Sequence, residues 1–135
     1  MSYANAAALQ SAVYQALVDD PGVSALVGGR VYDALPSGQL PALYVTLGAE
    51  KVRDASDTTG NGAWHDLTVA VVTSQSGFQV AKETAVAISD ALNEAELELA
   101  RGRLVGLRFL RAQARRESGG LRRIEMTFRA RVEDN

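Results

Sequence analysis

Hydrophobic residues follow two different spacings along the chain, and the first of them predicts helices. Apolar side chains recur every three or four positions over residues 5–19 and again over residues 78–95, which places them on one face of a helix in each segment. The first segment stops at Asp20-Pro21, and these two residues suit the N-cap and the first position of a second, shorter helix. The first hundred residues therefore predict three helical segments.

Alternating apolar and polar residues predict strands elsewhere. Residues 42–49 alternate, so this strand would bury one face and leave the other partly polar. Residues 64–74 are nearly apolar on both faces, which is typical of a strand in the centre of a sheet. Leu97 and Leu99 indicate a short edge strand, and residues 33–41, with two prolines and a glycine, indicate a loop.

The last part of the chain predicts a β-hairpin. Residues 123–133 alternate strictly, and residues 104–117 precede them through a turn at 118–120, where two glycines permit the positive φ that a tight turn needs. Leu110 interrupts the alternation of the first strand and indicates a β-bulge. The sequence thus predicts one α+β domain over residues 1–135, a mostly antiparallel sheet flanked by an N-terminal helix and a central helix.

The segment between the first two long strands differs from both in composition. Residues 50–63 combine charged residues with Ser, Thr, Gly and Asn, a composition that favours a long, mobile loop. Exposed loops carry binding residues more often than the elements that they connect. The expected partner-contact loop comprises Arg53, Asp54, Asp57, Thr58 and Asn61.

The net charge of −2 conceals two blocks of opposite sign. Residues 1–100 hold four basic and twelve acidic side chains, a net charge of −8, whereas residues 101–135 hold ten arginines and four acids, a net charge of +6. Guanidinium groups suit bidentate pairing with carboxylates, and blocks of opposite sign would let copies of the chain bind head to tail. The expected inter-subunit or lumen-lining residues are Arg108, Arg111, Arg115, Arg116, Arg129, Arg131, Glu94, Glu96 and Glu98.

The arginines are also compatible with two roles outside self-assembly. Ten arginines could meet the phosphates of DNA, so a non-specific DNA-contacting module is the alternative function. Against it stand an isoelectric point of about 5.4 and three glutamates, Glu117, Glu125 and Glu133, placed among the arginines. The hairpin could also be a soluble element whose cross-strand charges simply pair with one another.

The composition offers little for catalysis. The chain has no cysteine, which removes thiol nucleophiles and thiolate metal sites, and its single histidine is His65. A serine nucleophile elbow of the form G-x-S-x-G is absent from the sequence. We therefore expect a non-enzyme with no catalytic residue, cofactor or metal. The sequence also lacks a bilayer-length apolar run and the pattern of a signal peptide, so we expect synthesis in the cytoplasm and no membrane partner.

Several short motifs occur in an order that is typical of one family. LVGGRVYDALP at 26–36 precedes LPALYVTLG at 40–48, a variable loop, LTVAVVTSQSG at 67–77 and the arginine hairpin RRIEMTFRARVE at 122–133. In this order the motifs resemble the small tail-completion or tail-terminator proteins of long-tailed phages and phage-like gene transfer agents. The resemblance covers residues 6–133, and the Gly-Arg-Val-Tyr-Asp-x-x-Pro piece at 29–36, with its spacing to Pro41, carries most of it.

This resemblance implies a structural protein of a virus-like particle. Members of the family are expected to form a hexameric ring that caps the tail tube, stops its growth and joins the tail to the head-tail connector. The implied partners are further copies of the chain, the tail tube protein and the connector protein, with a passing contact to DNA. The implied location is the head-tail junction of a particle assembled in a bacterial cytoplasm. The family brings no catalytic or cofactor-binding residue.

Overall fold

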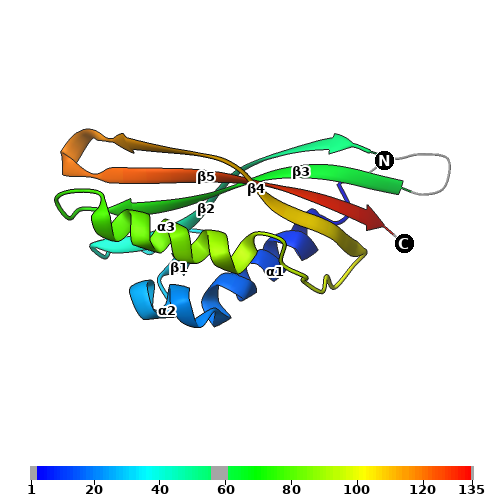
Figure 1. Ribbon diagram of the computed structural model, residues 1–135, viewed down its shortest axis with the longest axis horizontal. Coiled ribbons are helices and arrows are strands. Elements are labelled where there is room, and N and C mark those ends of the chain that lie inside the picture. The colour runs from blue at the N-terminus through cyan, green and yellow to red at the C-terminus, as the bar shows by residue number, and fades with distance from the viewer. Residues whose placement is uncertain (1–2, 56–60, 135) are drawn as a thin grey trace.

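The helices of the protein lie on one side of its β-sheet, as Figure 1 shows for this computed structural model, which describes residues 3–55 and 61–134. Within the described residues the helices are α1 (Ala6–Asp19), α2 (Pro21–Val27) and α3 (Gln79–Leu92). The strands are β1 (Val31–Tyr32), β2 (Leu43–Asp54), β3 (Asn61–Thr73), β4 (Arg103–Arg116) and β5 (Arg122–Asp134), and a 3-10 turn, η1 (Ser118–Gly120), joins the last two. The strand order is β1-β2-β3-β5-β4, antiparallel except for β1 beside β2. The predicted α+β class and the central place of β3 are confirmed.

The two N-terminal helices end and begin where the sequence predicts. The turn between them is fixed by Asp20, whose Oδ2 accepts a hydrogen bond at 3.0 Å from the backbone N–H of Val23, with Pro21 at the first position of α2. Gly28 then ends α2 at a φ of 59°, a backbone conformation that costs glycine little. No helix in residues 3–55 and 61–134 is long and apolar enough to span a bilayer.

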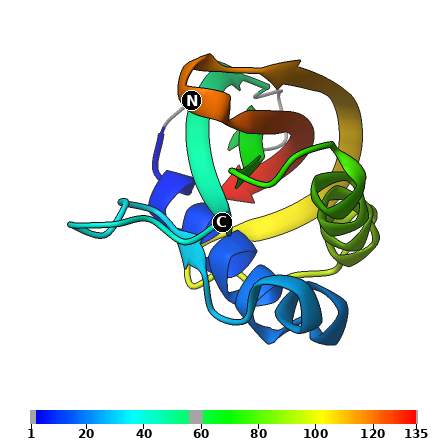
Figure 2. The same ribbon diagram turned by 90° about the vertical axis from the view of Figure 1, so that its left-hand side faces the viewer.

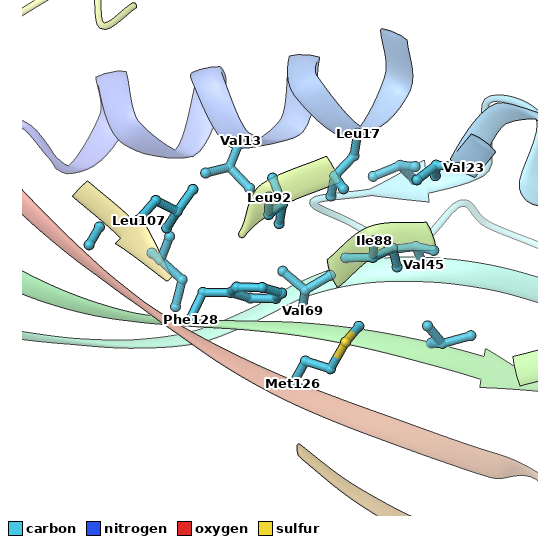
Figure 3. Close-up of a cluster of buried hydrophobic side chains, with 14 of the residues drawn as sticks. Val13, Leu17, Val23, Val45, Val69, Ile88, Leu92, Leu107, Met126 and Phe128 are labelled. Carbon is cyan, nitrogen blue, oxygen red and sulfur yellow. The ribbon is translucent and has the colours of Figure 1, made fainter. Parts of the chain in front are cut away.

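The hydrophobic core lies between the helices and the sheet (Figure 3). Val13 and Leu17 of α1 and Ile88 of α3 point toward Val69 of β3 and Phe128 of β5 in this view. All five are almost fully buried. Removing a side chain of this kind from water contributes roughly 1.5–3 kcal/mol. The periodic apolar residues that predicted the elements are thus the residues that hold them together.

The predicted long loop over residues 50–63 is wrong for most of its length. Residues 50–54 continue β2 and residues 61–63 begin β3, with Arg53 opposite Trp64 in the ladder. Lys51 and Arg53 are tolerated here because they point away from the helices, on the same face as their ladder partners Asp66 and Trp64. Of the predicted partner-contact residues, Asp57 and Thr58 lie outside the described part of the chain.

The predicted C-terminal hairpin is confirmed, including its turn and its bulge. Gly119 and Gly120 adopt φ values of 76° and 78° in the turn. The register of β4 against β5 shifts between Phe109 and Arg111, so Leu110 is the extra residue of a bulge. A second shift, between Leu104 and Gly106, was not predicted.

The predicted edge strand at Leu97 and Leu99 is wrong. Both residues are half-buried and pack against the core, but in the described residues they join no strand ladder. The segment is instead tied to β4 by its first residues: the backbone N–H of Glu94 donates to the carbonyl of Leu107 at 2.6 Å. Apolar and polar residues alternate around Leu97 and Leu99 because one side of this extended connector between α3 and β4 packs on the core.

Candidate assembly interface

The arginines of the hairpin lie mainly on the sheet face that the helices leave uncovered. They alternate along β5 with Ile124, Met126 and Phe128, which belong to the core. Residues that are opposite one another in a ladder share a face, and Arg108 pairs with Arg129 in the register. We term this surface the arginine face; it comprises Arg108, Arg111, Arg115, Arg123, Arg129 and Arg131.

Arg116 does not belong to the arginine face, although the sequence placed it in the same interface. It pairs in the register with Arg122, which lies one position out of phase with Arg123 and so on the helix side of the sheet. The guanidinium of Arg122 lies 5.5 Å from the ring centroid of Phe78 and donates to the carbonyl of Gln75 at 3.2 Å. The end of the hairpin therefore carries positive charge on both faces.

Part of the arginine face is neutralised within the chain. The guanidinium of Arg129 donates to both carboxylate oxygens of Asp66, at 2.8 and 3.0 Å, and both side chains are partly buried. This pairing holds the pKa of Asp66 below its ordinary value. Arg115 and Arg123 both bind Glu117, and the hydrogen bond from Arg123 is the main cause of a lowered pKa at that carboxylate. These arginines are ordered by contacts of the protomer itself.

Trp64, the single tryptophan, orders two more cations on the same face. The guanidinium carbons of Arg53 and Arg131 lie 5.6 and 5.3 Å from its ring centroid, a distance at which a cation is attracted to the π-face. Arg131 also donates to the carbonyl of Ala55 at 2.9 Å. From the sequence, no role was assigned to Trp64 or Asp66. They could have been identified from their alternate positions in β3, which neighbours β5 and places both on the face of its arginines.

Two arginines of this face are exposed and lie outside its ion pairs. Arg108 and Arg111 are exposed and form no ion pair with any residue in 3–55 or 61–134. They are three positions apart, and they share a face only because the bulge at Leu110 lies between them. Their guanidinium groups are available to an acidic partner.

A groove of about 470 Å³ brings predicted interface residues of both signs together. Glu94 and Glu96 of the α3–β4 connector line it beside Arg108, Arg129 and Arg131. The two charge blocks of the sequence therefore do not form two separate sides of the protomer, because the connector runs back along β4. Glu98 is exposed and is not part of the groove lining.

His65 is the buried end of a polar cluster that reaches the surface at Tyr3. Its Nδ1 lies 2.9 Å from Oε2 of Glu50, and Oε1 of Glu50 accepts a hydrogen bond at 2.6 Å from the hydroxyl of Tyr3. This hydrogen bond raises the pKa of Tyr3. His65 itself is fully buried. The described ranges, 3–55 and 61–134, hold no group of three or more His, Cys, Asp or Glu side chains that could bind a metal.

Comparison with known proteins decides the family. A protein-family model described as "Tail completion protein gp17" matches residues 11–133. The chain belongs to this tail-completion family. A solved structure described as "Virion of native gene transfer agent (GTA) particle" contains a chain that is 59% identical, with a TM-score of 0.93, covering 98% of this chain and 99% of that one. No curated protein sequence matches. The resemblance that the motifs indicated is confirmed, and membership of the tail-completion family makes the chain a structural protein of tail assembly.

Proposed function

We propose that this chain is a tail terminator, whose copies form a ring that caps the tail tube and joins it to the head-tail connector. One observation carries the proposal: nearly the whole chain matches, at 59% identity, a chain of a gene transfer agent virion. A chain this similar over its full length is expected to occupy the same kind of place in a particle. Synthesis in a bacterial cytoplasm and incorporation at the head-tail junction are part of the proposal.

The ring, with six copies as the expected number, needs contacts between two different surfaces of neighbouring copies. On one side we assign Arg108 and Arg111, which are exposed and form no ion pair with a described residue. On the other side we assign Glu98 of the connector, which is exposed and lies outside the groove that Glu94 and Glu96 share with Arg108. Charge pairs of this kind fix the register of a contact and disfavour wrong partners.

The tail tube and the connector would contact the end of the β2–β3 hairpin at which β2 ends and β3 begins. Arg53 and Asp54 end β2, and Asn61 begins β3, so the predicted contact residues that the structure describes lie together at this end. Shortening the chain between residues 54 and 61 should leave the protomer folded and impair the joining of tails to heads. Normal joining by the shortened chain would remove this end of the β2–β3 hairpin from the contact.

The test of the ring is a mass measurement. The purified chain is measured alone and with the tail tube protein, by light scattering and by electron microscopy of tube ends. We expect a ring of about six copies at the tube end, whether or not the chain associates without the tube. A chain that stays monomeric in both samples and leaves tube ends bare would overturn the proposal.

The same sample tests the alternative of a DNA-contacting module. Affinity for duplex DNA is measured at several salt concentrations, because each neutralised phosphate adds about 0.9 to the slope of log K against log salt. The internal ion pairs of Arg115, Arg123 and Arg129 remove much of the charge that DNA would use. We therefore expect weak binding with a slope of about two or less.

A further inference from the structure

A second groove, on the helix side of the sheet, is apolar and uncovered. It has a volume of about 430 Å³ and lies between α3 and β4; its lining includes Ala85, Val86, Phe109, Ala112, Ile124 and Met126. We term it the α3–β4 groove. Val86 is 59% exposed and Phe109 is 41% exposed, so large apolar side chains face the solvent here. Small residues such as Ala112, opposite Met126 in the ladder, leave the groove open.

The 33–41 loop carries an exposed apolar side chain on another part of the molecule. In the end-on view of Figure 2 this loop, drawn in cyan, projects away from the body, while α3 lies on the other side. All residues from 33 to 39 are exposed, and Leu35 is 51% exposed. Pro36 and Pro41 restrict the backbone of the loop, which lowers the entropy lost when it is ordered against a partner.

We propose that the 33–41 loop of one copy of this chain inserts Leu35 into the α3–β4 groove of the next copy. The inference deepens the proposed function, on which it rests, by naming the surfaces that meet in the ring. Loop and groove also match in charge. Asp33 is the one charged residue of the loop, and Lys82 is the one charged residue that lines the groove. Neither forms an ion pair with a residue of the described ranges.

The placement of the two surfaces determines the kind of assembly. The loop projects on one side of the protomer and α3, which lines the groove, lies on the other (Figure 2), so one contact leaves a free loop and a free groove at the ends of each pair. Such a head-to-tail contact continues until the ring closes. A symmetric dimer would use both surfaces and stop at two copies.

The first experiment uses covalent trapping, which suits a chain that has no cysteine of its own. The double variant Leu35→Cys/Val86→Cys is oxidised in assembled particles and on tail tubes, and then run on non-reducing gels. We expect a ladder of covalent dimers and higher species that disappears on reduction. The matched control is Leu35→Cys/Val105→Cys, because Val105 is also on an exposed part of the protomer, at 49%, but outside the groove.

The second experiment uses complementation between two variants. Leu35→Asp removes the loop contact and Val86→Asp removes the groove contact, so each variant alone should associate at least tenfold more weakly, as expected for losing one buried aliphatic side chain. In a mixture, the Val86→Asp variant supplies an intact loop and the Leu35→Asp variant supplies an intact groove, so one contact can form per pair. We expect the mixture to form 1:1 dimers and nothing longer.

The outcomes separate this inference from the proposed function. Rings that form on tubes, but show no more covalent product in the Val86 variant than in the Val105 control, would overturn the loop-in-groove contact and leave the ring standing. Copies that fail to associate under any condition would overturn both. Unchanged association of both aspartate variants would also overturn the contact.

Discussion

The pairing of Asp66 with Arg129 gives a stability that should depend on pH in a defined way. The variant Asp66→Asn keeps the shape of the side chain and removes its charge. In the wild type the two hydrogen bonds from Arg129 are bidentate, and the side chains are only 20% and 24% exposed. Charge-assisted, partly buried bonds of this kind are stronger than surface ion pairs, so we expect a loss of about 1–2 kcal/mol at pH 7.

The direction of the pH effect follows from the lowered pKa of Asp66. The hydrogen bond from Arg129 moves this pKa below its ordinary value of 3.8 in the folded protein. The folded state therefore holds the proton less tightly than the unfolded state does. The stabilisation is fully present above the unfolded pKa and is lost as pH falls through the folded pKa. The difference between wild type and variant should thus be constant from pH 7 to about pH 5 and shrink below it.

Urea unfolding at a series of pH values measures this difference directly. A loss of about 1–2 kcal/mol corresponds to a fall in melting temperature of roughly 3–8 °C for a chain of this size. Glu98→Gln is the control, because Glu98 is exposed and in no ion pair with a described residue, so its stability should follow the wild type at every pH. A loss at Asp66→Asn that stays the same at pH 2 and pH 7 would refute the pairing as its cause.

Further variants test three other parts of the molecule. The double variant Arg108→Glu/Arg111→Glu should abolish ring formation on tubes. It should change the free energy of unfolding by less than about 0.5 kcal/mol, because both side chains are exposed and unpaired among the described residues. The control is Arg116→Glu, on the other face of the sheet, which should leave assembly intact. Trp64→Ala should cost about 1–3 kcal/mol in urea unfolding, because two stacked cations lose their platform; a stability equal to wild type would exclude this role. Phe128→Ala should cost about 3–5 kcal/mol, because it empties the centre of the core, and a smaller loss would show that the core collapses around the gap.

Hydrophobic spacing predicted the elements whose apolar side chains are buried. The helix over 5–19 and the alternating strand over 123–133 were identified because the apolar residues that make up each pattern are the ones buried in the core. The bulge at Leu110 was identified for the same reason, as an interruption of that pattern. Membership of the family was also accessible, because its motifs are turns and strands with fixed spacing.

The arrangement of the candidate interface residues was less accessible, because charge patterns do not encode which residues lie together. Glu94 and Arg108 belong to blocks of opposite sign, yet the connector brings them to the same groove. The composition around Arg53 and Asn61 predicts a loop, but both residues end strands, because exposed ladder positions tolerate polar residues. Arg116 was grouped with the other arginines although it faces the opposite way, which only the register reveals.

The two bulges of β4 have a consequence for how the gene can change length. Leu110 is the residue that the ladder skips at the first bulge, and Val105 is the one skipped at the second. Deleting either would restore a regular ladder and leave every other side chain facing as before. Deleting Ala112 would instead invert the following residues, sending the Arg115 side chain toward the helices and Ala114 away from them. Single-residue deletions at these two positions should therefore disturb the strand less than a deletion at Ala112 does.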